Sequence, residues 1–218
     1  MSLLCLAKIL RHEAAAPGHY RLTFAAPEMA RVAEPGQFVH VRCGDTLDPL
    51  LRRPLSLHGI DRAAGTLTLL YRVVGRGTEL LSRLPAGATL DVMGPLGRGF
   101  YLPAPVQTAG EQKTGNIQPA ENGRPAESNR VPGETELAAS SRELSGAKLS
   151  VSNRPVVTEA LVVGGGLGVA PLLPLVEALV QRGLPVTVML GARSADGLLA
   201  AEEFSQTGAR IELATDDG

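Results

Sequence analysis

Four glycines within five positions form the stretch whose residue types point most directly to chemistry. They are Gly164, Gly165, Gly166 and Gly168. The apolar run 160–163 precedes them, and Pro171 and a second apolar segment follow. This pattern predicts a buried strand, a tight turn and a helix. Backbone N–H groups at such a turn, with no side chains in the way, are suited to bind a phosphate, so we expect the turn from Gly164 through Leu167 to Gly168 to bind a nucleotide cofactor.

The spacing differs from the common dinucleotide fingerprint. It runs Gly166-x-Gly168-x-x-Pro171, with proline in place of the third glycine. An acidic residue about 20 positions on, which would hold a ribose hydroxyl, is also missing. The next predicted strand, 186–190, leads instead to Arg193, whose charge would suit a 2′-phosphate and hence NADP. The alternative is a tight turn that binds no ligand.

A second motif stands at the start of a predicted strand in the first half of the chain. It reads Arg53-Pro54-Leu55-Ser56. An arginine can hold a pyrophosphate through two parallel hydrogen bonds. The serine adds a hydroxyl three positions on, and the proline restricts the backbone between them. Taken alone, the motif is also compatible with a solvated arginine and an edge-strand serine.

A third motif, residues 70–78, combines a strand, a Gly-x-Gly-Thr sequence and a predicted helix. Its candidate binding residues are Leu70, Tyr71, Arg72, Gly77 and Thr78. We expect Gly77 and Thr78 to bind phosphate at the helix start, with Thr78 as N-cap. Tyr71 is one of three tyrosines in a chain without tryptophan, which makes it a candidate for stacking on a cofactor ring.

Short apolar segments separated by Gly and Pro fill the first hundred residues. The predicted strands are 5–11, 20–25, 37–43, 56–61, 67–74 and 89–93, with a helix over 77–84. Six short strands at this spacing favour a small antiparallel barrel. We therefore assign 1–101 to a β-barrel domain.

The pattern changes twice in the second half. Residues 102–159 are rich in Gly, Pro, Ser, Asn, Gln and Glu and have no sustained apolar period, which predicts a disordered linker or insertion. From 160 onward, strands at 161–163, 186–190 and 210–214 alternate with helices at 172–181 and 197–206. This order predicts a parallel-sheet α/β domain over 160–218. Because the first strand of such a sheet normally has neighbours on both sides, we expect this domain to be incomplete.

Composition sets limits on the class of protein. The chain has 218 residues, 44% hydrophobic content and a net charge of −1, so no basic excess indicates nucleic acid or a membrane surface. The apolar N-terminus contains Lys8, lacks a cleavage site and is too short to span a membrane, so we expect a cytoplasmic protein. Cys5 and Cys43 do not form a metal-ligand pattern, nor do the four scattered histidines, and we expect no metal site.

Together these segments resemble the ferredoxin-reductase superfamily, in which a flavin-binding barrel precedes a nicotinamide-binding domain. Residues 53–56 match its Arg-x-x-Ser flavin motif. Within it, the chain is most similar to the electron-transfer subunits of type B dihydroorotate dehydrogenase. The segments that carry the similarity are 52–56, 70–78, 90–100, 164–175, 191–204 and 214–218.

The resemblance implies a function in pyrimidine biosynthesis. Dihydroorotate would be oxidised at FMN in a partner catalytic subunit of a heterotetramer, and electrons would pass through a [2Fe–2S] cluster to FAD in this chain and then to NAD. The cofactors carry this chemistry, so we expect no catalytic side chain.

Two departures stand out: the long 102–159 segment, and the absence of the cysteine-rich tail whose four thiolates would hold the cluster. We therefore expect a fragment or truncated product. The alternatives are a free-standing NAD(P)H–flavin or ferredoxin reductase, and a truncated FAD-binding chain without activity.

Overall fold

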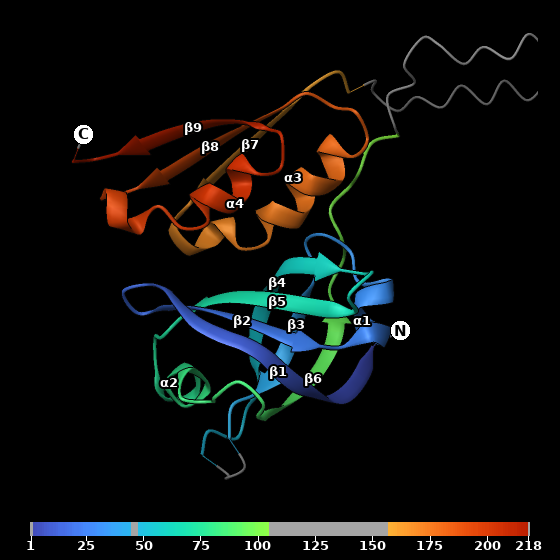
Figure 1. The fold of residues 1–218 in the computed structure, drawn as a ribbon, viewed down its shortest axis with the longest axis vertical. Coiled ribbons are helices and arrows are strands. Elements are labelled where there is room, and N and C mark those ends of the chain that lie inside the picture. The colour runs from blue at the N-terminus through green and yellow to red at the C-terminus, as the bar shows by residue number, and fades with distance from the viewer. Residues whose placement is uncertain (1, 45–47, 105–156, 218) are drawn as a thin grey trace, which may run out of the picture. The chain divides into compact units, whose positions relative to one another are not determined.

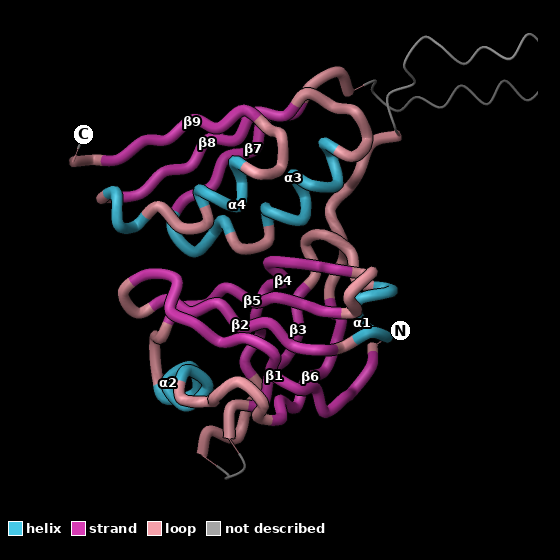
Figure 2. Tube along the Cα trace, in the orientation of Figure 1, coloured by secondary structure: helices cyan, strands magenta, loops and turns pink. Residues whose placement is uncertain are grey.

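The computed structural model describes residues 2–44, 48–104 and 157–217, which belong to one compact unit. Most of the predicted 102–159 linker lies outside the described residues, so that prediction remains untested. The described chain contains a closed barrel and a separate three-stranded sheet. Figures 1 and 2 show the strands and helices of both.

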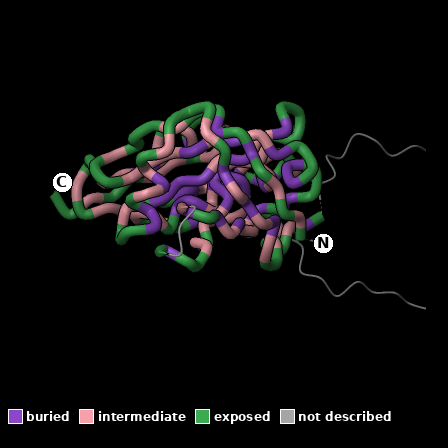
Figure 3. Tube along the Cα trace, turned by 90° about the horizontal axis from the view of Figure 1, so that it is seen from below, coloured by how far each residue is buried: buried purple, intermediate pink, exposed green. Residues whose placement is uncertain are grey.

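The first half forms the predicted antiparallel barrel. Its strands are β1 (Leu3–Ala16), β2 (His19–Ala25), β3 (Phe38–Arg42), β4 (Arg53–Asp61), β5 (Thr66–Arg72) and β6 (Thr89–Leu96). The order around the barrel is β1-β2-β5-β4-β3-β6. Alternating apolar residues fill the interior, including Phe24, Leu69 and Val92, which are fully buried. Figure 3 shows buried segments of the chain in the interior of the fold and exposed segments toward its outside.

The long strand β1 closes the barrel by pairing with two neighbours. Its first part, Leu3–Lys8, pairs with β6, and its second part, from Ile9 to Ala16, pairs with β2. The β1–β2 register shifts between Ile9 and Arg11, an irregularity of the kind that bends a strand. One strand can therefore serve both sheet edges, which leaves neither open.

Two short helices accompany the barrel. Helix α1 (Pro27–Val32) was not predicted, although Pro27 begins it and Glu28 lies in its first turn. Helix α2 (Arg76–Ser82) lies close to the predicted position. The expectation that Thr78 is its N-cap is wrong, because Gly75 holds that position. The Thr78 hydroxyl instead accepts a hydrogen bond from the Val74 N–H and donates one to the Gly75 carbonyl, each 3.0 Å long.

The second half forms the predicted parallel sheet. Its elements are β7 (Ala160–Gly165), the 3-10 turn η1 (Gly166–Val169), α3 (Leu172–Val180), β8 (Val186–Ala192), η2 (Ala195–Gly197), α4 (Ala201–Ser205) and β9 (Arg210–Thr215). The strand order is β7-β8-β9. Helices α3 and α4 lie on the same face of the sheet (Figure 1). Val176 and Phe204 bury their side chains there with Val162 and Val188.

The single helix predicted over 197–206 is wrong. The chain forms η2 and α4 instead, and Ala200 between them has a left-handed backbone with φ of 59°. A helix cannot continue through that conformation. A side chain at Gly197 would also lie 3.2 Å from the Ala192 Cβ, so this turn packs tightly against the end of β8.

The face of the sheet opposite α3 and α4 is exposed. Leu161, Val163 and Met189 are 64%, 65% and 44% exposed there. Within residues 157–217, β7 pairs with β8 only, so it lies at the sheet edge and not between two neighbours. None of the helices in the described part of the chain is long and apolar enough to cross a membrane.

Candidate functional site

The glycine turn follows β7 directly. Its glycines differ in whether the structure requires glycine at that position. A Cβ at Gly164 would lie 2.7 Å from Leu172 Cδ1 and 3.0 Å from Val169 Cγ1, so this position needs glycine for packing. Gly166 has φ of +50°, a backbone that favours glycine. A Cβ at Gly166 or Gly168 would meet nothing within 4 Å. Packing therefore does not explain Gly168, and its backbone is open to a ligand.

This difference gives a stability prediction. We expect Gly164→Ala to lower the free energy of unfolding by about 1–3 kcal/mol, because the new methyl group would overpack the turn. Gly168→Ala should change it by less than about 0.5 kcal/mol. Urea denaturation of both variants and the parent chain measures the difference. Equal effects of the two substitutions would contradict this account of the turn.

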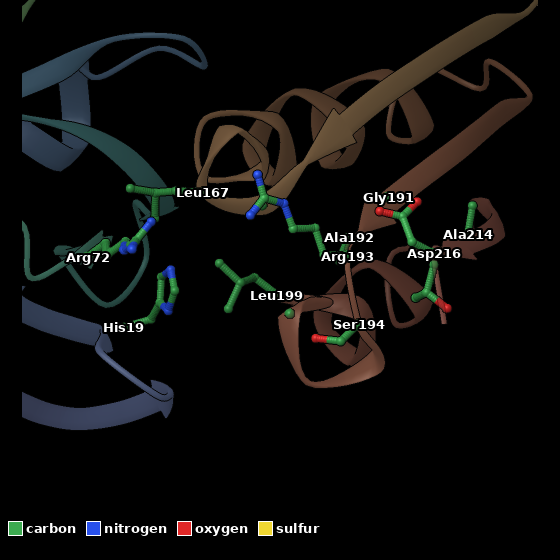
Figure 4. A pocket seen from close by; sticks show the side chains of 13 residues that line it. His19, Arg72, Leu167, Gly191, Ala192, Arg193, Ser194, Leu199, Ala214 and Asp216 are labelled. Carbon is green, nitrogen blue, oxygen red and sulfur yellow. The ribbon is translucent and has the colours of Figure 1, made fainter. Parts of the chain in front are cut away.

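A cavity of about 770 Å³ opens where the three parallel strands end; we call it the sheet-end cavity. Gly166 and Leu167 line it after β7, and further residues line it at the ends of β8 and β9 or directly after them. Those are Gly191, Ala192, Arg193, Ser194, Ala214, Thr215 and Asp216. Figure 4 shows Arg72 and His19 of the barrel among the lining side chains as well. Ligands of open α/β sheets bind at this end of the strands.

A second cavity, of about 390 Å³, lies against β4 and β5; we call it the barrel cavity. Its walls hold ten of the fourteen predicted binding residues: Arg53, Pro54, Leu55, Ser56, Leu70, Tyr71, Arg72, Thr78, Leu167 and Gly168. Gly77 does not line it but touches a wall residue, since a Cβ there would lie 2.7 Å from Arg53 Nε. Gly164 and Gly165 line neither cavity. The motif at residues 53–56 and the motif at residues 70–78 therefore lie next to each other, with Arg53 at their contact.

The two cavities share wall residues. Arg72 and Leu167 line both of them. Arg72 ends β5, and Leu167 lies within η1. A ligand in one cavity would therefore lie next to a ligand in the other. Ser56 and the glycine turn, which the sequence placed in separate motifs, reach the same region, because Ser56 and Gly168 both line the barrel cavity.

Tyr71, the candidate for stacking on a cofactor ring, packs against other side chains of the barrel. Its ring is 1% exposed and stacks on Tyr20, with centroids 5.8 Å apart and an interplanar angle of 22°. His12 Nδ1 lies 2.7 Å from the Leu84 carbonyl and so donates to it, which leaves Nε2 to accept from the Tyr71 hydroxyl at 2.9 Å. Burial raises the pKa of Tyr71 well above its ordinary value. The ring thus packs in the barrel core, and Tyr71 also forms part of the wall of the barrel cavity.

Leu70 points the other way on the same strand. It is 2% exposed and packs with Val169, Ala170 and Leu173 in the apolar cluster around α3. Successive residues of a strand face opposite sides, which explains why Leu70 and Tyr71 lie in different clusters. Leu70 thereby makes one wall of the barrel cavity apolar.

Several residues of these cavities were not predicted as binding residues. The largest missed set is 191–194 and 214–216 at the sheet-end cavity. Their signal was available, since each segment directly follows a predicted parallel strand. His19, Ala170 and Pro171 also line the cavities. They carry no comparable local signal.

No cluster of metal-ligating side chains occurs in the described parts of the chain. Cys5 lies on β1, and Cys43 is buried just after β3. Burial raises the pKa of both thiols, with the nearby Asp91 adding to the effect at Cys5, so the thiolate form that binds metal is disfavoured.

Comparison with known proteins agrees with this architecture. The electron transfer subunit of dihydroorotate dehydrogenase B (NAD(+)) from Desulforamulus reducens is 40% identical over 218 residues, which cover 100% of this chain and 64% of that protein. The subunit of the same name from Streptococcus pneumoniae is 32% identical over 211 residues, 97% of this chain and 62% of that protein. The chain is a homologue of these electron transfer subunits. It spans less than two thirds of their length. No family model matches it.

Solved structures show the same fold. A structure of NADH-dependent reduced ferredoxin–NADP oxidoreductase matches with a TM-score of 0.64 at 23% identity, covering 98% of this chain and 58% of that one. Phthalate dioxygenase reductase matches with a TM-score of 0.59 at 14% identity, covering 99% of this chain and 52% of that one. The barrel and the parallel sheet therefore form a ferredoxin-reductase-like fold.

Proposed function

We propose that this chain is an electron-transfer flavoprotein subunit that binds FAD in the barrel cavity and NAD in the sheet-end cavity. The observation that carries the proposal is the shared wall, Arg72 and Leu167. Two redox rings must lie in contact for a hydride to pass between them. The names of the relatives and the fold both support a flavin- and nicotinamide-dependent electron transfer.

The residues of the barrel cavity fit a flavin nucleotide. Arg53 Nη1 donates to the Leu51 carbonyl at 2.6 Å, and among the described residues no carboxylate pairs with Arg53, so its remaining N–H groups are available to a phosphate. The glycine at 77 lets that guanidinium lie against α2. Leu55 and Leu70 give the cavity apolar walls that exclude water, and the Ser56 hydroxyl can hydrogen-bond to a ring edge. Bound FAD would supply the hydride and single-electron chemistry, which requires no side-chain acid or base here.

The residues of the sheet-end cavity fit a nicotinamide nucleotide. The open backbone at Gly166 and the hydroxyl groups of Ser194 and Thr215 can bind phosphate and ribose oxygens. Arg72 and Arg193 add positive charge, and Asp216 adds one negative charge. Arg193 also favours a second candidate, a free-standing reductase that uses NADP, because its guanidinium could bind a 2′-phosphate.

The two cysteines of the chain do not fit a [2Fe–2S] cluster, which needs four ligands. The proposed electron transfer within this chain therefore does not include a [2Fe–2S] cluster. By analogy with its relatives, we propose an FMN-containing, dihydroorotate-oxidising catalytic subunit as partner, in a heterotetramer of pyrimidine biosynthesis.

A spectroscopic experiment tests the proposal. The purified chain is titrated with FAD, and the complex is then mixed with NADH or NADPH without oxygen while the visible flavin absorption is followed. We expect FAD to bind, NADH to bleach the absorption, and NADPH to act more slowly. Faster bleaching by NADPH would favour the NADP reductase. Binding of FAD without bleaching by either nucleotide would identify a flavin-binding chain without activity.

A further inference from the structure

A buried histidine links the barrel to the glycine turn. His58 on β4 is 2% exposed, and its Nδ1 lies 3.0 Å from the carbonyl oxygen of Ala170, the residue that follows η1. A carbonyl oxygen only accepts hydrogen bonds, so Nδ1 carries a hydrogen. Ser56, two residues before His58, lines the barrel cavity together with Ala170. The bond therefore fixes the turn directly beside the place where the two cavities meet.

The other ring nitrogen faces a carboxylate. His58 Nε2 is buried, has no hydrogen-bond partner, and lies 3.7 Å from Glu203 Oε1 on α4. In the neutral ring, the Nε2 lone pair would point toward this negative charge. In the protonated ring, the same contact becomes attractive. Glu203 also forms an ion pair with Arg21 on β2, so the cluster joins two barrel strands to the α/β part of the chain.

Two carboxylates, those of Glu203 and Glu177, interact with this imidazole. The charged groups facing the cluster are Glu203 on α4, Glu177 on α3, Asp61 on β4, Arg21 on β2 and Glu13 on β1. Arg62 and Arg182 line a separate cavity with Glu177. His58, followed by Arg21, lowers the pKa of Glu203 against the opposing effect of burial. Burial raises the pKa of Glu177, and His58 partly opposes that shift.

We propose that His58 is a positioning residue whose imidazolium bridges the Ala170 carbonyl and the Glu203 carboxylate and so holds the glycine turn in register with β4. Its role in hydride transfer depends on the proposed function, whereas the bridge itself does not. Loss of the Nε2 proton would remove the attraction to Glu203 and loosen the turn beside Arg72 and Leu167. A variant that breaks this contact should therefore reduce bound FAD with NADH more slowly than the parent chain.

Two variants and one control separate this role from a general structural one. His58→Gln keeps an N–H donor for Ala170 but cannot titrate. Glu203→Gln removes the charge and leaves the Ala170 bond. His40→Gln changes a histidine on β3 outside the cluster. In the FAD complex at a single pH, we expect His40→Gln to reduce flavin at the parent rate, whereas His58→Gln and Glu203→Gln reduce it about tenfold more slowly.

Two measurements on the full chain do not depend on activity. Nitrogen-15 NMR of the histidine rings should show a hydrogen on both Nδ1 and Nε2 of His58. Amide hydrogen exchange in Gly166–Ala170 should be faster in His58→Gln than in the parent at low pH. An Nε2-protonated neutral ring, or unchanged exchange, would overturn the bridge. A bridge without NADH-driven reduction in any variant would refute the proposed function but not the positioning of the turn.

Discussion

Replacing Arg53 by alanine is expected to weaken FAD binding by about 10- to 100-fold. Charged hydrogen bonds of the kind an arginine makes to phosphate contribute about 1.5–3 kcal/mol, and each 1.4 kcal/mol corresponds to a factor of ten in affinity. Arg53 lines the barrel cavity, and its guanidinium lies against Gly77 at the start of α2. Quenching of flavin fluorescence during titration measures the dissociation constant.

The neighbouring arginine provides a matched control. Arg52 Nη2 donates to Asp91 Oδ2 at 2.8 Å, and Nη1 donates to the Asp91 carbonyl at 3.1 Å. It does not line the barrel cavity. Arg52→Ala should therefore lower the free energy of unfolding while leaving FAD affinity within about twofold of the parent. Equal loss of FAD affinity in both variants would indicate that the effect comes from the fold, and the phosphate role of Arg53 would be refuted.

The barrel could be predicted because its signals are local. Several strands alternate apolar and polar residues, and Gly or Pro marks most of the turns. The same alternation also explains the burial of Tyr71. Leu67, Leu69 and Tyr71 occupy every second position of β5, and the two leucines are fully buried in the barrel. Every second residue of a strand faces the same side of the sheet. Tyr71 therefore points into the barrel together with the two leucines.

The His58 cluster could not be predicted, because its partners are distant in sequence. His58 and Ala170 are separated by 112 positions, and Arg21 and Glu203 by 182. The sequence around His58 predicts only that this residue lies on a strand. What makes it unusual is the combination of burial with a carbonyl on one side and a carboxylate on the other. Only the packing of α3 and α4 creates that environment.

Replacing Leu167 by tryptophan is expected to slow NADH-driven reduction of bound flavin by about 100-fold. Leu167 lies in the wall that both cavities share, and a larger ring there would separate the two cofactors. A displacement of about 1 Å between reacting groups costs a rate factor of this size. Stopped-flow absorbance at saturating FAD and NADH measures the reduction step, and the FAD titration shows whether the barrel cavity still binds flavin.

Leu161→Trp is the control for the added ring. Leu161 lies on β7, six residues before Leu167, but it is 64% exposed on the sheet face away from α3 and α4. Its substitution should leave both the FAD affinity and the reduction rate close to those of the parent. If Leu167→Trp also reduced flavin at the parent rate, the two cofactors would not meet at Leu167, because a tryptophan at their contact must change the distance between them. The shared wall would then not be the route of the hydride, and a different arrangement of the two cofactors would be required.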